Sequence, residues 1–160
     1  MEKLILDACC GSKMFWFNKD NPEVLFADKR TESHILCDGR KLEIKPDIEA
    51  DFTAMPFPEN AFKLVVFDPP HLQRGGDTSW IVKKYGRLPK EWSAYITKGA
   101  SECFRVLKPG GILIFKWNED QIKVSEILKC FEHKPLFGHP SGKAMKTHWI
   151  TFMKPEKPNQ

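Results

Sequence analysis

Runs of consecutive apolar residues, separated by helix-like stretches, constrain the fold of this chain more than any other feature. A strand with one face in solvent alternates apolar and polar residues, whereas these runs are mostly continuous. Continuous runs are typical of strands that are buried on both faces of a parallel sheet. We predict strands at residues 3–8, 23–28, 47–52, 63–68, 110–117, 134–138 and 147–154.

Helical periodicity fills much of the sequence between these runs. From residue 91 to residue 107 the apolar residues recur every three to four positions, and the sequence KPGG then ends the pattern. Further helices are predicted at 118–131, where an asparagine and two acids suit a helix start, and at 12–22. The alternation predicts one α/β domain, residues 1–154, and the polar end, 155–160, is predicted to be a disordered tail.

Composition excludes several classes of protein. No apolar run approaches the roughly 18 residues that a membrane span needs, so no membrane association is expected. Five cysteines without framework spacing, together with a weak N-terminal apolar run, indicate reduced thiols in a cytoplasmic protein. The histidines and cysteines lack zinc-type spacing, so no metal is expected. The net charge of +4 permits nucleic-acid binding but does not by itself indicate it.

Polar residues follow five of the predicted strands. Because parallel strands point the same way, their carboxyl ends meet at one edge of the sheet, which is where open α/β sheets bind ligands. The residues at these ends are Asp7 and Gly11, then Asp28, Asp51, Asp68, and finally Lys116 with Asn118.

The turn after the first strand, LDACCGS, has one glycine where a dinucleotide-binding turn would have three. This disfavours a pyrophosphate and permits a smaller carboxylate, such as that of a methionine moiety. Asp28, at the next strand end, can accept hydrogen bonds from two ribose hydroxyls. Asp51 can bond an adenine amino group while Phe52 packs on the ring. The alternatives are a plain tight connection for the turn, and a helix cap or solvated charge for Asp28.

Together these segments resemble the class I S-adenosylmethionine-dependent methyltransferases. ILDACCGS stands in the first motif, LFADKR in the acidic second, ADFTAMPFPENAFKLVVFDPP in the third and fourth, and ECFRVLKPGGILIF leads into the fifth strand. The resemblance implies a Rossmann-like, mostly parallel sheet of seven strands in the order 3-2-1-4-5-7-6, with helices on both faces. It implies S-adenosylmethionine as cofactor, bound by Asp7, Cys9, Gly11, Ser12, Asp28, Asp51 and Phe52.

The sequence Asp68-Pro69-Pro70-His71 resembles the Asp/Asn-Pro-Pro-aromatic motif of amino methyltransferases. An exocyclic amino group is a poor nucleophile because its lone pair is delocalised into the ring. Asp68 can accept one of its N–H groups and the carbonyl of Pro69 the other, while the two prolines hold that carbonyl rigidly. His71 can stack on the base. We therefore predict that these four residues catalyse methylation of adenine N6 or cytosine N4 in DNA or RNA.

The segment after this motif, residues 72–92, mixes basic and aromatic residues, a composition that suits phosphates and bases. A solvated loop whose aromatic residues pack on the core is the alternative. The chain has no room for a separate recognition domain, so a homodimer or a recognition partner is expected if it selects a target sequence. The predicted substrate-binding residues are Arg74, Trp80, Lys83, Lys84, Lys116 and Asn118.

Three other functions stay open. A lysine at the end of the fifth strand, Lys116, near Asp68 is also compatible with 2′-O methylation of RNA. The same cofactor and the same motif would serve a methyltransferase that acts on a nitrogen of a small molecule or protein. A non-catalytic binding module would retain the fold without the reaction.

Overall fold

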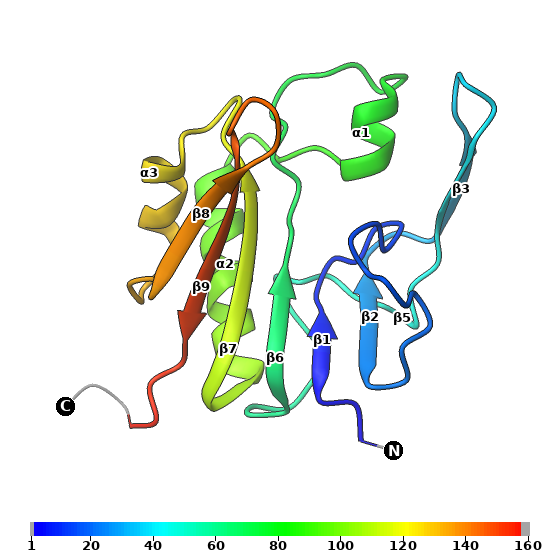
Figure 1. Ribbon diagram of the computed structural model, residues 1–160. Helices are drawn as coiled ribbons and strands as arrows, with labels where there is room; N and C mark the ends of the chain where they lie inside the picture. The colour runs from blue at the N-terminus through cyan, green and yellow to red at the C-terminus, as the bar shows by residue number, and fades with distance from the viewer. Residues whose placement is uncertain (1, 158–160) are drawn as a thin grey trace.

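Seven strands form one sheet in the computed structural model, which describes residues 2–157. The order across the sheet is β5-β2-β1-β6-β7-β9-β8 (Figure 1). Counted among the sheet's own strands this is 3-2-1-4-5-7-6, as predicted, and β9 is antiparallel to both of its neighbours. The strands are β1 (Ile5–Asp7), β2 (Val24–Asp28), β5 (Ile48–Glu49), β6 (Phe62–Phe67), β7 (Leu107–Asn118), β8 (Phe137–Ser141) and β9 (Thr147–Met153).

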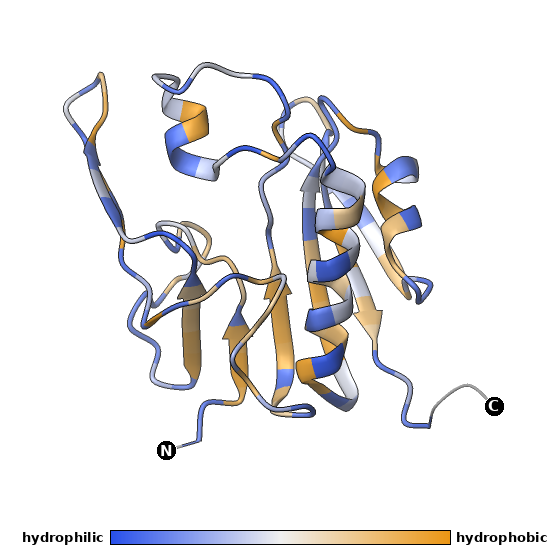
Figure 2. Ribbon diagram, turned by 180° about the vertical axis from the view of Figure 1, so that it is seen from behind, coloured by the Kyte–Doolittle hydropathy of each residue, from blue (hydrophilic) through white to orange (hydrophobic). Residues whose placement is uncertain are grey.

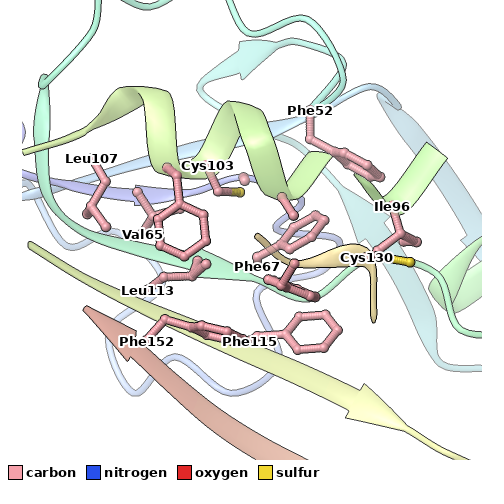
Figure 3. Packing of buried hydrophobic residues seen from close by; sticks show 14 of the residues in the cluster. Phe52, Val65, Phe67, Ile96, Cys103, Leu107, Leu113, Phe115, Cys130 and Phe152 are labelled. Atoms are coloured by element: carbon pink, nitrogen blue, oxygen red, sulfur yellow. The ribbon is translucent and has the colours of Figure 1, made fainter. Parts of the chain in front are cut away.

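One face of the sheet is covered by helices. α2 (Trp92–Val106), α3 (Val124–Ile127) and the 3-10 turn η1 (Leu128–Cys130) pack there against alternate residues of the central strands. Figure 3 shows Cys103 and Ile96 of α2 close to Phe67 of β6 and Phe115 of β7. Each such side chain contributes about 1.5–3 kcal/mol when fully buried, so this layer is the main source of stability.

The opposite face is covered far less. In-register pairing places Ile5, Leu64 and Ile112 on this side, and all three are half-buried. Its only buried cluster consists, within residues 2–157, of Cys10, Val24 and Phe26, with Ile5 and Trp16 packed beside it. The prediction of helices on both faces therefore holds for one face only.

The predicted helix at 12–22 is wrong, because this stretch is a series of turns within the first loop, residues 8–23. The side chain of Asn18 accepts the backbone N–H of Asp20 at 3.0 Å, a local bond that competes with helix formation. Phe15 and Trp16 contact two different strands, with ring centroids 5.4 Å from Trp149 and 5.3 Å from Phe26. Tertiary contacts of adjacent aromatic residues thus override the local pattern.

The predicted helix at 118–131 begins six residues late, at Val124. Strand β7 continues to Asn118, whose side-chain oxygen accepts the N–H of Asp120 at 3.0 Å. The carboxylate of Glu119 accepts the N–H of Val124 at 3.1 Å, which supplies an acceptor at the true helix start.

Two elements above the carboxyl edge of the sheet were not predicted. A hairpin of β3 (Glu32–Ile35) and β4 (Lys41–Ile44) and the short helix α1 (Trp80–Tyr85) both project at the end to which β1, β2 and β6 point (Figure 1). The Asp38-Gly39 turn, with φ of +84° at Gly39, closes the hairpin.

Helix α1 lies outside the main core. Arg30 donates a hydrogen bond to the carbonyl of Lys83 at 3.1 Å, which ties the helix to the end of β2. Figure 2 shows hydrophilic residues along much of the hairpin and α1, in contrast to the hydrophobic strands below. No helix within residues 2–157 is long and apolar enough to cross a membrane. The predicted tail at 155–160 lies partly outside the described residues.

Candidate active site

The carboxyl ends of β1, β2, β6 and β7 bring most of the predicted site residues together. Gly11, Asp28, Asp68 and Lys116 line one cavity, which we call the first pocket. Its enclosed volume is about 50 Å³. Of the other predicted residues, Cys9, Ser12, Phe52, Pro70 and Lys84 also line it.

Gly11 and Asp28 form the floor of the first pocket. The N–H of Gly11 donates to the Asp28 carboxylate at 2.9 Å, and the N–H of Arg30 donates to its other oxygen at 2.9 Å. Gly11 has φ of +50°, a conformation that glycine adopts at little cost. The turn and the end of β2 are thus joined through one buried carboxylate. Arg30 was missed by sequence reasoning, although it stands two residues after Asp28.

Asp7 lies beneath the first pocket and does not line it. Its carboxylate accepts the indole N–H of Trp16 at 2.7 Å and the N–H of Cys9 at 3.3 Å. Burial raises the pKa of Asp7 to about 7, and the negative charges of Asp68 and Asp28 act in the same direction. A proton is therefore held on this carboxyl group close to neutral pH.

Asp68 and Lys116 form an ion pair at the wall of the first pocket. The Lys116 ammonium lies 3.4 Å from Oδ2 of Asp68 and 5.5 Å from the centre of the Trp149 ring. Burial raises the pKa of Asp68, and the charge of Lys116 opposes that rise. Lys116 therefore favours the ionised form of this half-buried carboxylate.

A second pocket, of about 470 Å³, opens on the other side of this ion pair. His71, Trp80, Tyr85 and Asn118 line it together with Asp68 and Lys116. The rings of His71 and Tyr85 are 5.2 Å apart at an angle of 55°. Burial, with a smaller effect of Lys116, lowers the pKa of His71 to about 4, so the imidazole is neutral at pH 7.

Several predicted site residues line neither pocket. The carboxylate of Asp51 is exposed and accepts the N–H of Thr53 at 2.8 Å, and Pro69 is buried behind Pro70. Arg74 is exposed, and Lys83 contributes its carbonyl to the contact with Arg30.

The pockets also contain residues that sequence reasoning did not assign to the site. Phe15 and Tyr95 line the first pocket and Thr147 lines the second. Tyr95 belongs to the apolar pattern that predicts a helix over residues 91–107, and the centre of its ring lies 4.8 Å from that of Phe52. Its position in the first turn of α2, close to the carboxyl edge of the sheet, was the available signal.

Comparisons with known proteins bear on the fold. The PH0226 protein from Pyrococcus horikoshii OT3 superposes with a TM-score of 0.58 at 14% identity, covering 94% of this chain and 81% of that one. An S-adenosylmethionine-dependent methyltransferase from Methanosarcina mazei superposes with a TM-score of 0.53 at 12% identity, and the match covers 96% of this chain and 92% of that one. The cyclase SpnF superposes with a TM-score of 0.51 at 13% identity, and the match covers 94% of this chain and 74% of that one. No family model matches the chain, and no curated protein does.

These likenesses show that the chain has the Rossmann-like fold found in S-adenosylmethionine-dependent methyltransferases. Because a protein described as a cyclase shares that fold, the chemistry of this chain has to be argued from its own site.

Proposed function

We propose that this chain is an S-adenosylmethionine-dependent methyltransferase that methylates an amino nitrogen of a nucleic-acid base, adenine N6 or cytosine N4. One observation carries the proposal: Asp68 and Lys116 line both pockets. A cofactor in the first pocket and a base in the second would therefore meet at the Asp68 carboxylate.

The residues of the first pocket fit S-adenosylmethionine chemically. The Asp28 carboxylate at the end of β2 suits ribose hydroxyls, and the rings of Phe52 and Tyr95 suit a purine. Four cations, Lys29, Arg30, Lys84 and Lys116, line the same pocket against the two carboxylates of Asp28 and Asp68, and this charge suits the carboxylate end of the cofactor. When bound, S-adenosylmethionine supplies an electrophilic methyl group on a sulfonium.

The first pocket has to widen before it can hold this cofactor. Small-molecule sites usually enclose roughly 300–1,000 Å³, whereas this one encloses about 50 Å³. A Cβ placed on Gly11 would lie 3.9 Å from the carbonyl oxygen of Lys84, so α1 lies close to the turn. Gly75 and Gly86 flank α1 with φ of +150° and +78°. We infer that α1 withdraws about these glycines when the cofactor enters.

Asp68 acts by orientation in this proposal. Its Oδ2 faces Lys116, while Oδ1 has no hydrogen-bond partner within the described residues and can accept one amino N–H. The carbonyl of Pro69, to which no hydrogen bond is donated within residues 2–157, is the second acceptor in this proposal; because Pro69 is buried and lines neither pocket, the carbonyl has to become accessible when the base enters. The nitrogen lone pair then points toward the methyl group, and the proton leaves after transfer. The neutral His71, beside Tyr85, supplies a stacking surface for the base.

The Lys116–Asp68 contact also supports a second candidate, 2′-O methylation of ribose. There Lys116 would assist deprotonation of a hydroxyl group, and Asp68 would hold the lysine. Two prolines and a half-buried neutral imidazole have no role in that reaction, so we rank it second.

Transfer of labelled methyl groups to DNA, RNA, protein and small metabolites tests the proposal. Asp68→Ala is the test variant, and Glu126→Ala is the matched control because that carboxylate is exposed and lines no described pocket. We expect an N-methylated base, lost in Asp68→Ala and retained in Glu126→Ala. Label on ribose would move the assignment to the second candidate, and label on protein or metabolites alone would contradict a nucleic-acid substrate.

A further inference from the structure

A third cavity, of about 570 Å³, lies between the hairpin, the first loop and α1. We call it the hairpin groove. The hairpin is not hydrogen-bonded to the main sheet and projects beside α1 at the carboxyl end of the strands (Figure 1). Neither pocket described above includes a residue of this hairpin.

The hairpin groove concentrates positive charge. Its cations outnumber its carboxylates, Asp20 and Glu43, by four, which equals the net charge of the entire chain. The remainder of the molecule is therefore balanced, and the basic character of the protein is located here. The cations are Lys13, Lys19, Arg40, Lys41, Lys45 and Lys84.

Much of this charge is available to a ligand. Lys41 pairs with Glu43 at 3.4 Å, and Arg40 pairs with Asp38 at 2.6 Å. Lys19, Lys45 and Lys84, by contrast, form no ion pair with any carboxylate of residues 2–157. Three uncompensated ammonium groups in one groove form a binding site for an anionic ligand that carries more than one charge.

The hairpin groove is continuous with the two pockets through α1. Trp80 lines both the groove and the second pocket, and Lys84 lines both the groove and the first pocket. Trp80 is 46% exposed, and the Lys84 ammonium lies 5.6 Å from the centre of its ring. An exposed indole beside a lysine offers a stacking surface next to a phosphate contact.

We propose that the hairpin groove binds the backbone of a single-stranded nucleic acid, next to the nucleotide whose base enters the second pocket. This inference rests on the proposed function for the role of the second pocket. A flexible strand can follow a groove of this volume and present an unstacked base to Trp80, which a base-paired duplex cannot do. Lys19 and Lys45 then contact phosphates from the first loop and from the end of β4.

Charge reversal tests the inference. The test variant is Lys19→Glu/Lys45→Glu, and the matched control is Lys63→Glu/Lys98→Glu, two exposed lysines that line no described pocket. Both variants change the net charge equally, so long-range attraction is matched. Fluorescence anisotropy would report binding of a mixed-sequence oligonucleotide of about 12 nucleotides, single-stranded or as a duplex. Cofactor binding and thermal unfolding check that each variant is folded; if the test variant is not, Lys19→Gln/Lys45→Gln replaces it, with Lys63→Gln/Lys98→Gln as the control of equal charge.

We expect the test variant to bind the single strand at least about tenfold more weakly than the control does, with cofactor binding unchanged. Loss of two phosphate contacts should reduce the slope of log affinity against log salt by about 1.4. Equal losses in test and control, no binding by the parent protein, or tighter binding of the duplex would each overturn the inference.

Methyl transfer, measured on the same samples, separates the two proposals. Groove-dependent binding without a methylated base would leave the groove in place and refute the proposed function. Equal rates of base methylation by the test and control variants would support the proposed function and refute the inference about the hairpin groove.

Discussion

One face of the sheet lies under α2, α3 and η1, whereas within residues 2–157 the opposite face has only the first loop against part of it. The contrast is visible along β7. Leu113 and Phe115 are fully buried on the helical face, while Ile114 and Lys116, which alternate with them, are half-buried on the other. Pairing places Lys116 beside Trp149 and Asp7 beside Val66 on that second face. Stability is thus concentrated on one side of the sheet, and the charged groups of the candidate site on the other.

The largest expected effect separates chemistry from stability. Asp68→Ala should lower kcat for methyl transfer about 10²–10³-fold, because it removes the acceptor that orients the amino group. The free energy of unfolding should change by no more than about 1 kcal/mol, since Asp68 makes one long contact with Lys116. Kinetics and chemical denaturation on one preparation measure both. A parallel loss of activity and stability would show that the two sides are not separate.

Neighbouring residues of β7 provide the direct test of the two faces. Leu113→Ala should reduce the free energy of unfolding by about 3 kcal/mol, because it leaves a cavity under α2. Ile114→Ala, one position along and half-buried, should cost about 1 kcal/mol. Urea denaturation of the two variants gives the difference, and equal values would mean that both faces contribute alike.

Asp7, which lies on the less covered face, should make the free energy of unfolding depend on pH. Its pKa is about 7 in the folded protein, so the folded state keeps a proton that the unfolded chain releases near pH 4. Stability therefore falls as pH rises through this interval, and the full penalty is present above pH 7. Between pH 5 and pH 8 the parent should lose roughly 2–3 kcal/mol relative to Asp7→Asn. Denaturation at both pH values measures this, and parallel curves would remove Asp7 as the cause.

The smallest predicted effect probes how tightly the helical face is packed. A Cβ on Gly99 of α2 would lie 2.5 Å from the ring of Phe52 and 2.8 Å from that of Phe67. Gly99→Ala should therefore destabilise the protein by about 1–2 kcal/mol, although alanine favours helices. Ser101→Ala, exposed on the same helix, should change stability by less than about 0.5 kcal/mol. A stabilised Gly99→Ala would mean that the Phe52 ring yields easily, and cofactor affinity would then shift with it.

Sequence reasoning identified what depends on long apolar runs and missed what depends on contacts between distant segments. The strands and α2 follow from periodicity, the sheet order from the family resemblance of the motifs, and Asp28, Asp68 and Lys116 from their places at strand ends. The first loop was misjudged because Phe15 and Trp16 are held by Trp149 and Phe26. The hairpin had a recognisable signal in Asp38-Gly39 and in the exposed–buried alternation of β4. A search for continuous apolar runs does not detect such an alternating strand.

The sequence did not predict helix α1 for a different reason. It is a six-residue element with no buried residue, followed by Gly86 and held by Arg30. Its sequence carries too few residues for a periodic pattern, and its placement depends on the carboxylate of Asp28, which also anchors the first turn.

The position of α1 has a thermodynamic consequence. Tyr85 lines the first and second pockets, Lys84 the first pocket and the hairpin groove, and Trp80 the second pocket and the groove. A ligand that displaces this helix from one cavity therefore reshapes the other two. Under the proposed function, cofactor and nucleic acid would then bind with a coupling free energy, and by linkage each would change the affinity of the other by the same factor.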